Sequence, residues 1–402
     1  MIRKRFLLLT VIMMLIANGI VNARVLEPID GFYKKIFSRT FASNGVDLFV
    51  QKYPMLCFPT QLETQYPKLV RAFSDYNEGL IKAAKAERTE IVAQARQRHS
   101  EAPQYFSAFF SDNDLLIRRA DSYVVSLINE FRNYSGGAHG MYGWYGVNFD
   151  SETGKRLTVS DICTDANKLY TAIIKRLYAD HDNRAFDNLD GTLMKLIVED
   201  TINFVIEPRG VTFIFNPYEI APYAAGLITA TILFDEQPGL FKTKYTQSVN
   251  AYAQSVPLYQ STIIDRNGSR ATLTVIDERD KCVVHINNQM ITIAITNISV
   301  PTYVHTADGK NFLYIDGIAR ADGFSGVEGE CISVLKLDGE LELYDRMPYT
   351  FRHLTDNERT SDETMWWLMT NPNSMQFDSS RPVGDMFSHS GAVSNDGTFS
   401  FG

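Results

Sequence analysis

The sequence lacks the short motifs that identify most hydrolases, nucleotide-binding proteins and metalloenzymes. It contains no G-x-S-x-G turn, no phosphate-binding loop, no H-E-x-x-H pair and no Rossmann glycine pattern. Histidine is scarce, with seven in 402 residues, and the histidines are scattered without metal-ligand spacing. We therefore expect no cofactor and no metal, and we assign no catalytic residue. Whether the chain is an enzyme stays open at this point, with a non-enzymatic role favoured.

Positive charge is also in short supply. The chain has 39 Lys and Arg against 47 Asp and Glu, which gives a formal net charge of -8. Nucleic acids and anionic lipid surfaces are bound by clusters of Lys and Arg, and no such cluster is present. We expect neither as a partner.

Long apolar runs are absent after the first 25 residues. Arg3, Lys4 and Arg5 precede an apolar run over residues 6–21, which ends in Val21-Asn22-Ala23 with small residues at positions 21 and 23. This pattern predicts a signal peptide over residues 1–23, cleaved after Ala23. Because a membrane-spanning helix needs about 20 apolar residues, we expect no membrane span after cleavage. We expect an exported protein, periplasmic or secreted, with a charge of -11 once the three basic residues are removed.

Cysteine is limited to Cys57, Cys163, Cys282 and Cys331. No pair has C-x-x-C spacing, which argues against a redox or zinc site. An exported chain can form disulfides, and four cysteines allow three pairings. If each half of the chain keeps its own pair, the bonds are Cys57–Cys163 and Cys282–Cys331. The alternative is four free, buried thiols.

Periodicity predicts an α+β fold in two domains, an N-terminal domain over residues 24–250 with a mixed sheet and helices, and a β-rich domain over residues 255–402. The apolar spacing of residues 66–99 is helical, with a break expected near Gly79, and residues 168–181 and 191–202 are two further helices. One long strand is expected over residues 118–135. A β-hairpin is expected over residues 147–159.

The remaining strands follow from alternation and turn residues. Short strands are expected over residues 203–208, 211–216 and 227–234. In the second half, Asn267-Gly268 and Asp338-Gly339 separate alternating segments and predict hairpin turns. The tail from Pro372 is rich in Ser, Gly and Asn, and is expected to be loop-rich.

Two aromatic stretches are the candidate ligand-binding segments. The first is YSGGAHG, residues 134–140, and the second is NPYEIAPYAAG, residues 216–226. Glycine gives a ligand access to the backbone, tyrosine and tryptophan offer flat rings, and prolines fix the backbone of the second stretch. The candidate ligand-binding residues are Tyr134, His139, Tyr142, Trp144, Tyr218, Glu219 and Tyr223. The alternative is two structural corners whose aromatic rings belong to the core.

Together with NFDSETGKRLTVSDI, residues 148–162, these stretches resemble a bacterial extracytoplasmic domain family of unknown function. The family is similar to the ectodomain of lysozyme-sensing anti-sigma factors (RsiV) and to the non-catalytic domain of some peptidoglycan deacetylases (PdaC). The resemblance covers roughly residues 45–250, and it implies an α+β domain at the cell envelope with lysozyme as a partner. Only four residues follow Met1 before the apolar run, so we do not expect a sigma-factor role.

These observations favour a non-enzymatic cell-envelope protein that binds a lysozyme-like protein or peptidoglycan. The first alternative is an envelope structural or assembly factor that docks through its β-rich domain. The second is a cell-wall glycan hydrolase or deacetylase built on His139 as a general base, with Asp161 or Glu219 to orient it.

Overall fold

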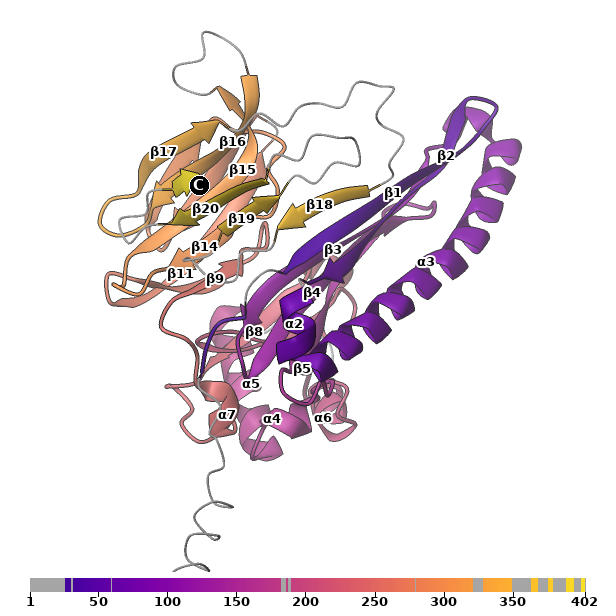
Figure 1. Ribbon diagram of the computed structural model, residues 1–402. Coiled ribbons are helices and arrows are strands. Elements are labelled where there is room, and N and C mark those ends of the chain that lie inside the picture. The colour runs from indigo at the N-terminus through magenta and orange to yellow at the C-terminus, as the bar shows by residue number, and fades with distance from the viewer. Residues whose placement is uncertain are drawn as a thin grey trace, which may run out of the picture.

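The computed structural model describes residues 26–29, 32–58, 60–181, 186, 189–278, 280–320, 328–348, 363–367, 375–378, 388–393 and 399–401 (Figure 1). The expected signal peptide lies outside these residues. Within them, no helix is long and apolar enough to cross a membrane. Helices and strands are both abundant, and the predicted α+β class is confirmed.

A six-stranded sheet forms the centre of the N-terminal part. Its order is β18-β1-β2-β3-β4-β5, with β2 and β3 parallel and the other pairs antiparallel. The parallel pair needs a crossover, which helix α3 supplies. The strands are β1 Tyr33–Ser43, β2 Val46–Cys57, β3 Phe109–Ala120, β4 Val124–Tyr134, β5 Met141–Asp150 and β18 Glu363–Trp367, and the helices between β2 and β3 are α2 Thr60–Gln65 and α3 Pro67–Glu101, followed by the 3-10 turn η1 Pro103–Tyr105.

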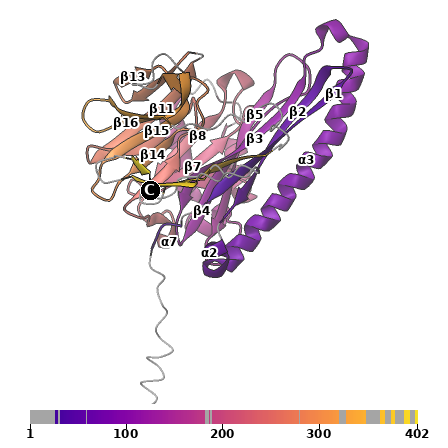
Figure 2. The same ribbon diagram turned by 45° about the horizontal axis from the view of Figure 1, so that its top comes forward.

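Helix α3 lies across one face of this sheet, on the side away from the C-terminal strands (Figures 1 and 2). Pro67 begins it, and Leu69, Phe73 and Ala84 lie on its buried face. Asn77 is buried among them because its amide side chain bonds the backbone N–H and the carbonyl of Leu56, at 3.0 and 2.7 Å. The helix runs without interruption through Gly79, so the expected break there is wrong.

A three-stranded sheet, β6-β7-β8, packs with three helices on the other side of the first sheet. Its strands are β6 Phe204–Ile206, β7 Gly210–Phe215 and β8 Ile228–Leu233, and the helices are α4 Val159–Ile162, α5 Ala166–Asp180 and α6 Leu189–Val198. The apolar faces of α5 and α6 share one core with this sheet. The two predicted helices and three predicted strands of this region are therefore confirmed.

The C-terminal part is rich in strands, as predicted. Two antiparallel sheets, β10-β11-β12-β13 and β17-β16-β15-β14-β9, contribute residues to one shared core. A short sheet β19-β20-β21 occupies part of the tail that was expected to be loop-rich. The bounds are β9 Tyr252–Ser255, β10 Thr262–Arg266, β11 Ser269–Glu278, β12 Lys281–Ile286, β13 Gln289–Ile293, β14 Thr302–His305, β15 Asn311–Arg320, β16 Glu328–Lys336, β17 Glu342–Pro348, β19 Met375–Asp378, β20 Ser388–Val393 and β21 Phe399–Phe401, with α7 Thr243–Thr246 before them.

Two expected elements differ from the structure because aspartates turn the chain. The long strand predicted over residues 118–135 is two strands, since the Asp121 carboxylate accepts hydrogen bonds from the backbone N–H groups of Tyr123 and Val124. The hairpin predicted over residues 147–159 has only its first strand. Asp150 bonds the N–H of Thr153 in the same way, and beyond one isolated bridge the chain enters α4.

The expected disulfides are absent. Cys163 is a free thiol that donates a hydrogen bond to the Asp165 carbonyl oxygen at 3.4 Å, and Cys282 is a free thiol in the C-terminal core. Each predicted pairing needs one of these two, so both pairings are wrong. Burial raises the pKa of Cys282 to about 12, which keeps it in the thiol form.

Consecutive arginines at the end of β3 hold the two parts of the chain together. Arg118 forms a buried ion pair with Glu207, with Nε 3.0 Å from Oε1, and also donates to the Ser255 carbonyl. Arg119 pairs with Asp121, with Nε 2.6 Å from Oδ2, and donates to the carbonyls of Tyr245 and Gln247. The linker into the C-terminal part is thus anchored to the first sheet.

Candidate functional site

The two aromatic stretches meet at one end of the first sheet. Residues 135–140 connect β4 to β5, and residues 216–227 connect β7 to β8. The Tyr223 ring stacks on His139 with centroids 4.0 Å apart and lies 5.5 Å from Tyr218 and 5.9 Å from Tyr142. Its hydroxyl donates to the Gly140 carbonyl at 2.8 Å. We call His139, Tyr142, Tyr218 and Tyr223 the aromatic cluster.

Sequence reasoning missed Asn216, which fixes the second loop against β5. Its side-chain oxygen accepts from the Trp144 N–H at 2.8 Å, and its amide nitrogen donates to the Trp144 carbonyl at 3.1 Å. Asn203 extends the pattern by bonding the Gly146 N–H and the Trp144 carbonyl, both at 2.7 Å. Side-chain amides therefore occupy the free edge of β5 where a further strand would otherwise pair.

Glu219 supports the loop from within. Its carboxylate accepts from the backbone N–H of Asn216 at 2.9 Å, which closes the turn over residues 216–219. Burial raises the pKa of Glu219 above its ordinary value, against the hydrogen bonds from Asn216 that lower it. Glu219 thus holds the loop and lies beside the exposed Tyr218.

The seven predicted residues do not all reach one surface. Trp144 is only 6% exposed and belongs to a core cluster with Leu116 and Ile214, so it lies beneath the site. Tyr134 packs beside Phe110, with ring centroids 6.3 Å apart, on the neighbouring strand. His139 and Tyr218 are exposed, and Tyr142 and Tyr223 are half-buried.

Tyr218 has an unusual backbone. Its φ is +73°, in the left-handed region that glycine and asparagine favour and that is strained for a tyrosine. The turn is held by a hydrogen bond from the Tyr218 N–H to the Ala221 carbonyl at 3.1 Å. Tyr218 is 60% exposed. Strain of this kind marks a candidate functional position.

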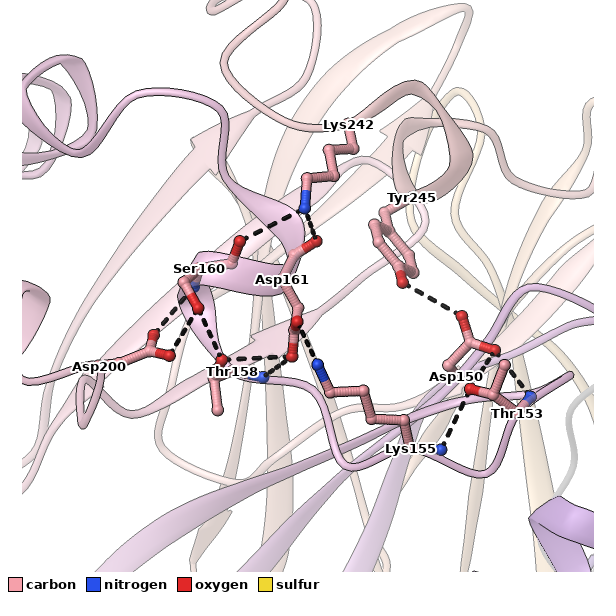
Figure 3. Close-up of polar contacts among 9 residues, drawn as sticks. All are labelled: Asp150, Thr153, Lys155, Thr158, Ser160, Asp161, Asp200, Lys242 and Tyr245. Atoms are coloured by element: carbon pink, nitrogen blue, oxygen red, sulfur yellow. Dashed lines mark hydrogen bonds and ion pairs between the residues drawn. The ribbon is translucent and has the colours of Figure 1, made fainter.

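The polar residues of the third sequence signature lie at the opposite end of β5 (Figure 3). Thr158 and Asp161 cap α4 reciprocally, Lys155 pairs with Asp161 at 2.5 Å, and Ser160 donates to Asp200 at 2.6 Å. Burial acts to raise the pKa of Asp161, but the hydrogen bonds from Lys155 and Thr158 outweigh it and lower the pKa. A ten-residue strand separates the two ends by roughly 30 Å, so Asp161 cannot orient His139.

His139 also lacks the surroundings of a general base. Its Nδ1 lies 2.9 Å from the neighbouring Gly140 carbonyl, and in the described part of the chain no carboxylate is hydrogen-bonded to the ring. No group of three or more His, Cys, Asp or Glu residues in that part could hold a metal ion. Among the described residues, this end of the sheet thus presents aromatic rings without an acid–base pair or a metal-ligand group.

Comparison with known proteins gives a family match to part of the chain. Residues 158–235 match the family described as "Protein of unknown function (DUF3298)". The match contains the loop over residues 216–226 and not the loop over residues 135–140. No match is found among curated proteins.

Two solved structures of DUF3298 family proteins are similar to this chain. One is from Bacteroides fragilis NCTC 9343, is 16% identical, covers 55% of this chain and 95% of its own, and has a TM-score of 0.40. The other is from Pseudomonas aeruginosa PAO1, is 16% identical, covers 56% of this chain and 97% of its own, and has a TM-score of 0.35. The segment that matches the DUF3298 family begins at the helix cap of α4 and ends just after β8.

Proposed function

We propose that this protein is an exported cell-envelope protein that binds a lysozyme-like protein or peptidoglycan through the aromatic cluster, without chemical turnover. The observation that supports it is the convergence of His139, Tyr142 and Tyr218 around Tyr223 from two segments far apart in sequence. The predicted signal peptide and the resemblance to RsiV and PdaC supply the envelope setting. In the part of the chain that the structure describes, no carboxylate is hydrogen-bonded to His139, which argues against the hydrolase alternative.

The cluster is a suitable binding surface because its backbone is fixed. Asn216 and Glu219 hold the second loop, and the Tyr223 hydroxyl joins it to the first. A tyrosine ring contributes a large contact area and loses little conformational freedom when it is already ordered. Among the three tyrosines of the cluster, a ligand would meet Tyr218 first, since Tyr218 is 60% exposed whereas Tyr142 and Tyr223 are half-buried.

The test is binding of the chain without residues 1–23 to immobilised lysozyme and to purified peptidoglycan, with muropeptide masses followed in parallel. We expect saturable binding to one of the two and unchanged muropeptide masses. Tyr218→Ala should weaken binding about 30-fold, as for an interface hot spot. Tyr145→Ala is the matched control, because Tyr145 is 53% exposed on the other face of β5.

Retention of neither ligand would contradict the proposal. Equal loss of binding in Tyr218→Ala and Tyr145→Ala would move the site away from the aromatic cluster. A change in muropeptide mass that disappears in His139→Ala would instead support the hydrolase alternative.

A further inference from the structure

One side chain of the C-terminal part packs on a core cluster of the N-terminal part. Val300 lies in the connection between β13 and β14, residues 294–301, and is half-buried. The cluster that it contacts consists of six buried apolar side chains of the N-terminal part, Leu116, Ile128, Trp144, Val205, Ile214 and Leu227. Ile298, two residues before Val300, packs instead on the core shared by the two C-terminal sheets. Val300 therefore joins one part of the chain to the core of the other.

The same core cluster supports the candidate ligand-binding segments. Tyr142 of the aromatic cluster also packs against it. Leu227 directly follows the loop over residues 216–226, and Trp144 is hydrogen-bonded to that loop through Asn216. Val300 thus shares its packing partners with both segments that meet at the site.

Tyr142 connects this core to the exposed rings. A Cβ atom added to Gly226 would lie 3.2 Å from the Tyr142 hydroxyl oxygen, so the Tyr142 side chain reaches the end of the second loop. The Tyr142 ring meets the Tyr223 ring edge to face, with centroids 5.9 Å apart, and Tyr223 stacks on His139. A displacement of Tyr142 would therefore change how Tyr223 and His139 lie.

Hydrogen bonds on both sides fix the backbone of Val300 within the C-terminal part. The Ser299 N–H donates to the Asp316 carbonyl at 3.0 Å, and the Ser299 hydroxyl donates to Asp316 Oδ2 at 3.2 Å. On the other side, the Pro301 carbonyl accepts from the N–H of the fully buried Val256 at 2.7 Å. A side chain on such a fixed backbone can hold its packing partners in place.

We propose that Val300 is a positioning residue of the candidate site, through which the C-terminal part holds Tyr142 and the loop over residues 216–226 in the arrangement that binds ligand. This inference rests on the proposed function and adds a requirement for the β-rich part of the chain. A loosened support lowers affinity because the rings must then be ordered when the ligand binds. A valine that only fills space would affect stability and leave the arrangement of the rings unchanged.

The experiment uses the chain without residues 1–23, with lysozyme and soluble peptidoglycan fragments as the two binding probes. Val300→Ala removes two methyl groups from a half-buried position, so the variant should fold. It should weaken binding of the retained probe about fivefold. Val300→Ile keeps the apolar contact and should bind as the wild type does. Val249→Ala is the matched control, because Val249 is also half-buried but packs on the C-terminal core.

A second measurement needs no ligand. Because His139 stacks on Tyr223 with centroids 4.0 Å apart, the ring current of Tyr223 shifts the proton NMR signals of the His139 ring, which His139→Gln identifies. In Val300→Ala these signals should move toward the positions of an exposed histidine. In Val249→Ala and Val300→Ile they should stay in place.

The two measurements separate this inference from the proposed function. Unchanged His139 signals in folded Val300→Ala overturn the positioning role, and binding of either probe by the wild type then leaves the proposed function intact. Equal loss of affinity in Val300→Ala and Val249→Ala also overturns it, since general destabilisation would explain both. Binding of neither probe by the wild type contradicts the proposed function, whereas displaced His139 signals in Val300→Ala would still support the part of Val300 in placing the rings.

Discussion

Replacement of Arg119 by methionine should be among the most destabilising single substitutions in the N-terminal part. Arg119 is 3% exposed and its partner Asp121 is fully buried. The substitution removes the ion pair at 2.6 Å and the hydrogen bonds to the carbonyls of Tyr245 and Gln247. It leaves the Asp121 carboxylate buried with only backbone N–H donors. Breaking one side of a buried pair costs about 3–5 kcal/mol.

The assay is thermal unfolding followed by circular dichroism and calorimetry. At about 2–4 °C per kcal/mol for a domain of this size, Arg119→Met should lower Tm by roughly 6–20 °C. Arg132→Met is the control, because its ion pair is exposed and should contribute less than about 1 kcal/mol. Adding Asp121→Asn to Arg119→Met removes the unpaired charge and should restore part of the loss. If Arg119→Met costs no more than Arg132→Met, the buried pair does not anchor the linker.

Five further predictions concern two glycines, two carboxylates and a thiol. Gly79→Ala should stabilise by about 0.5–1 kcal/mol, because Gly79 is exposed in mid-helix with open space around it, and urea unfolding measures this. Gly146→Ala should cost about 3 kcal/mol or more by the same assay, since its Cβ would lie 1.7 Å from a backbone oxygen of β6. Burial acts to raise the pKa of Asp150, but hydrogen bonds from a lysine and a threonine outweigh it and lower the pKa. The Asp150 carboxylate thus contributes to stability above about pH 4, and this contribution is lost as pH falls further. Asp150→Asn should be less stable than wild type at pH 7 by about 1.5–3 kcal/mol, and this difference in unfolding free energy should shrink in acid. Burial raises the pKa of Glu130, so the wild type loses stability as pH rises above about 4.3, and Glu130→Gln should have the higher Tm at pH 7 but not at pH 4. Cys282 should resist N-ethylmaleimide in the native protein and react after unfolding without reductant, and a mass showing it already oxidised would contradict the free thiol.

The elements that sequence predicted well are those defined by local signals. Helices α5 and α6 carry apolar residues at helical spacing and lie where expected. Asn267 and Gly268 both have positive φ, as the hairpin turn that their dipeptide predicts requires. In each case the physical cause lies within a few residues of its effect.

The misplaced elements depend on contacts that sequence spacing does not reveal. Residues 33–43 alternate poorly, yet β1 forms because β2 offers it a paired edge. The strand expected over residues 118–135 is divided at Asp121. The carboxylate of Asp121 accepts the backbone N–H of Tyr123 and also a hydrogen bond from the buried guanidinium of Arg119. Alternation cannot distinguish a strand that continues from one that turns at such a residue.

The sequence identified residues of the candidate site but not how their side chains lie relative to one another. The glycine–aromatic stretch and the NPYEIAPYAAG stretch were both singled out, and Tyr223 and His139 do meet. Trp144 was assigned to the surface because its burial depends on β7, about 70 residues away. Asn203 and Asn216 were missed because their role follows from β5 being an edge strand, which only the assembled sheet shows.

The strain at Tyr218 is not offset by burial of its side chain. Asparagine adopts a positive φ more easily than tyrosine, and five other positive-φ residues in the described part of the chain are Asn or Asp. Tyr218 is 60% exposed, and its ring lies 5.5 Å from the Tyr223 ring, centroid to centroid. The hydrogen bonds of Asn216 and Glu219 fix the loop in this conformation. We therefore interpret the exposed Tyr218 ring as a candidate ligand contact, which is the interpretation that Tyr218→Ala tests.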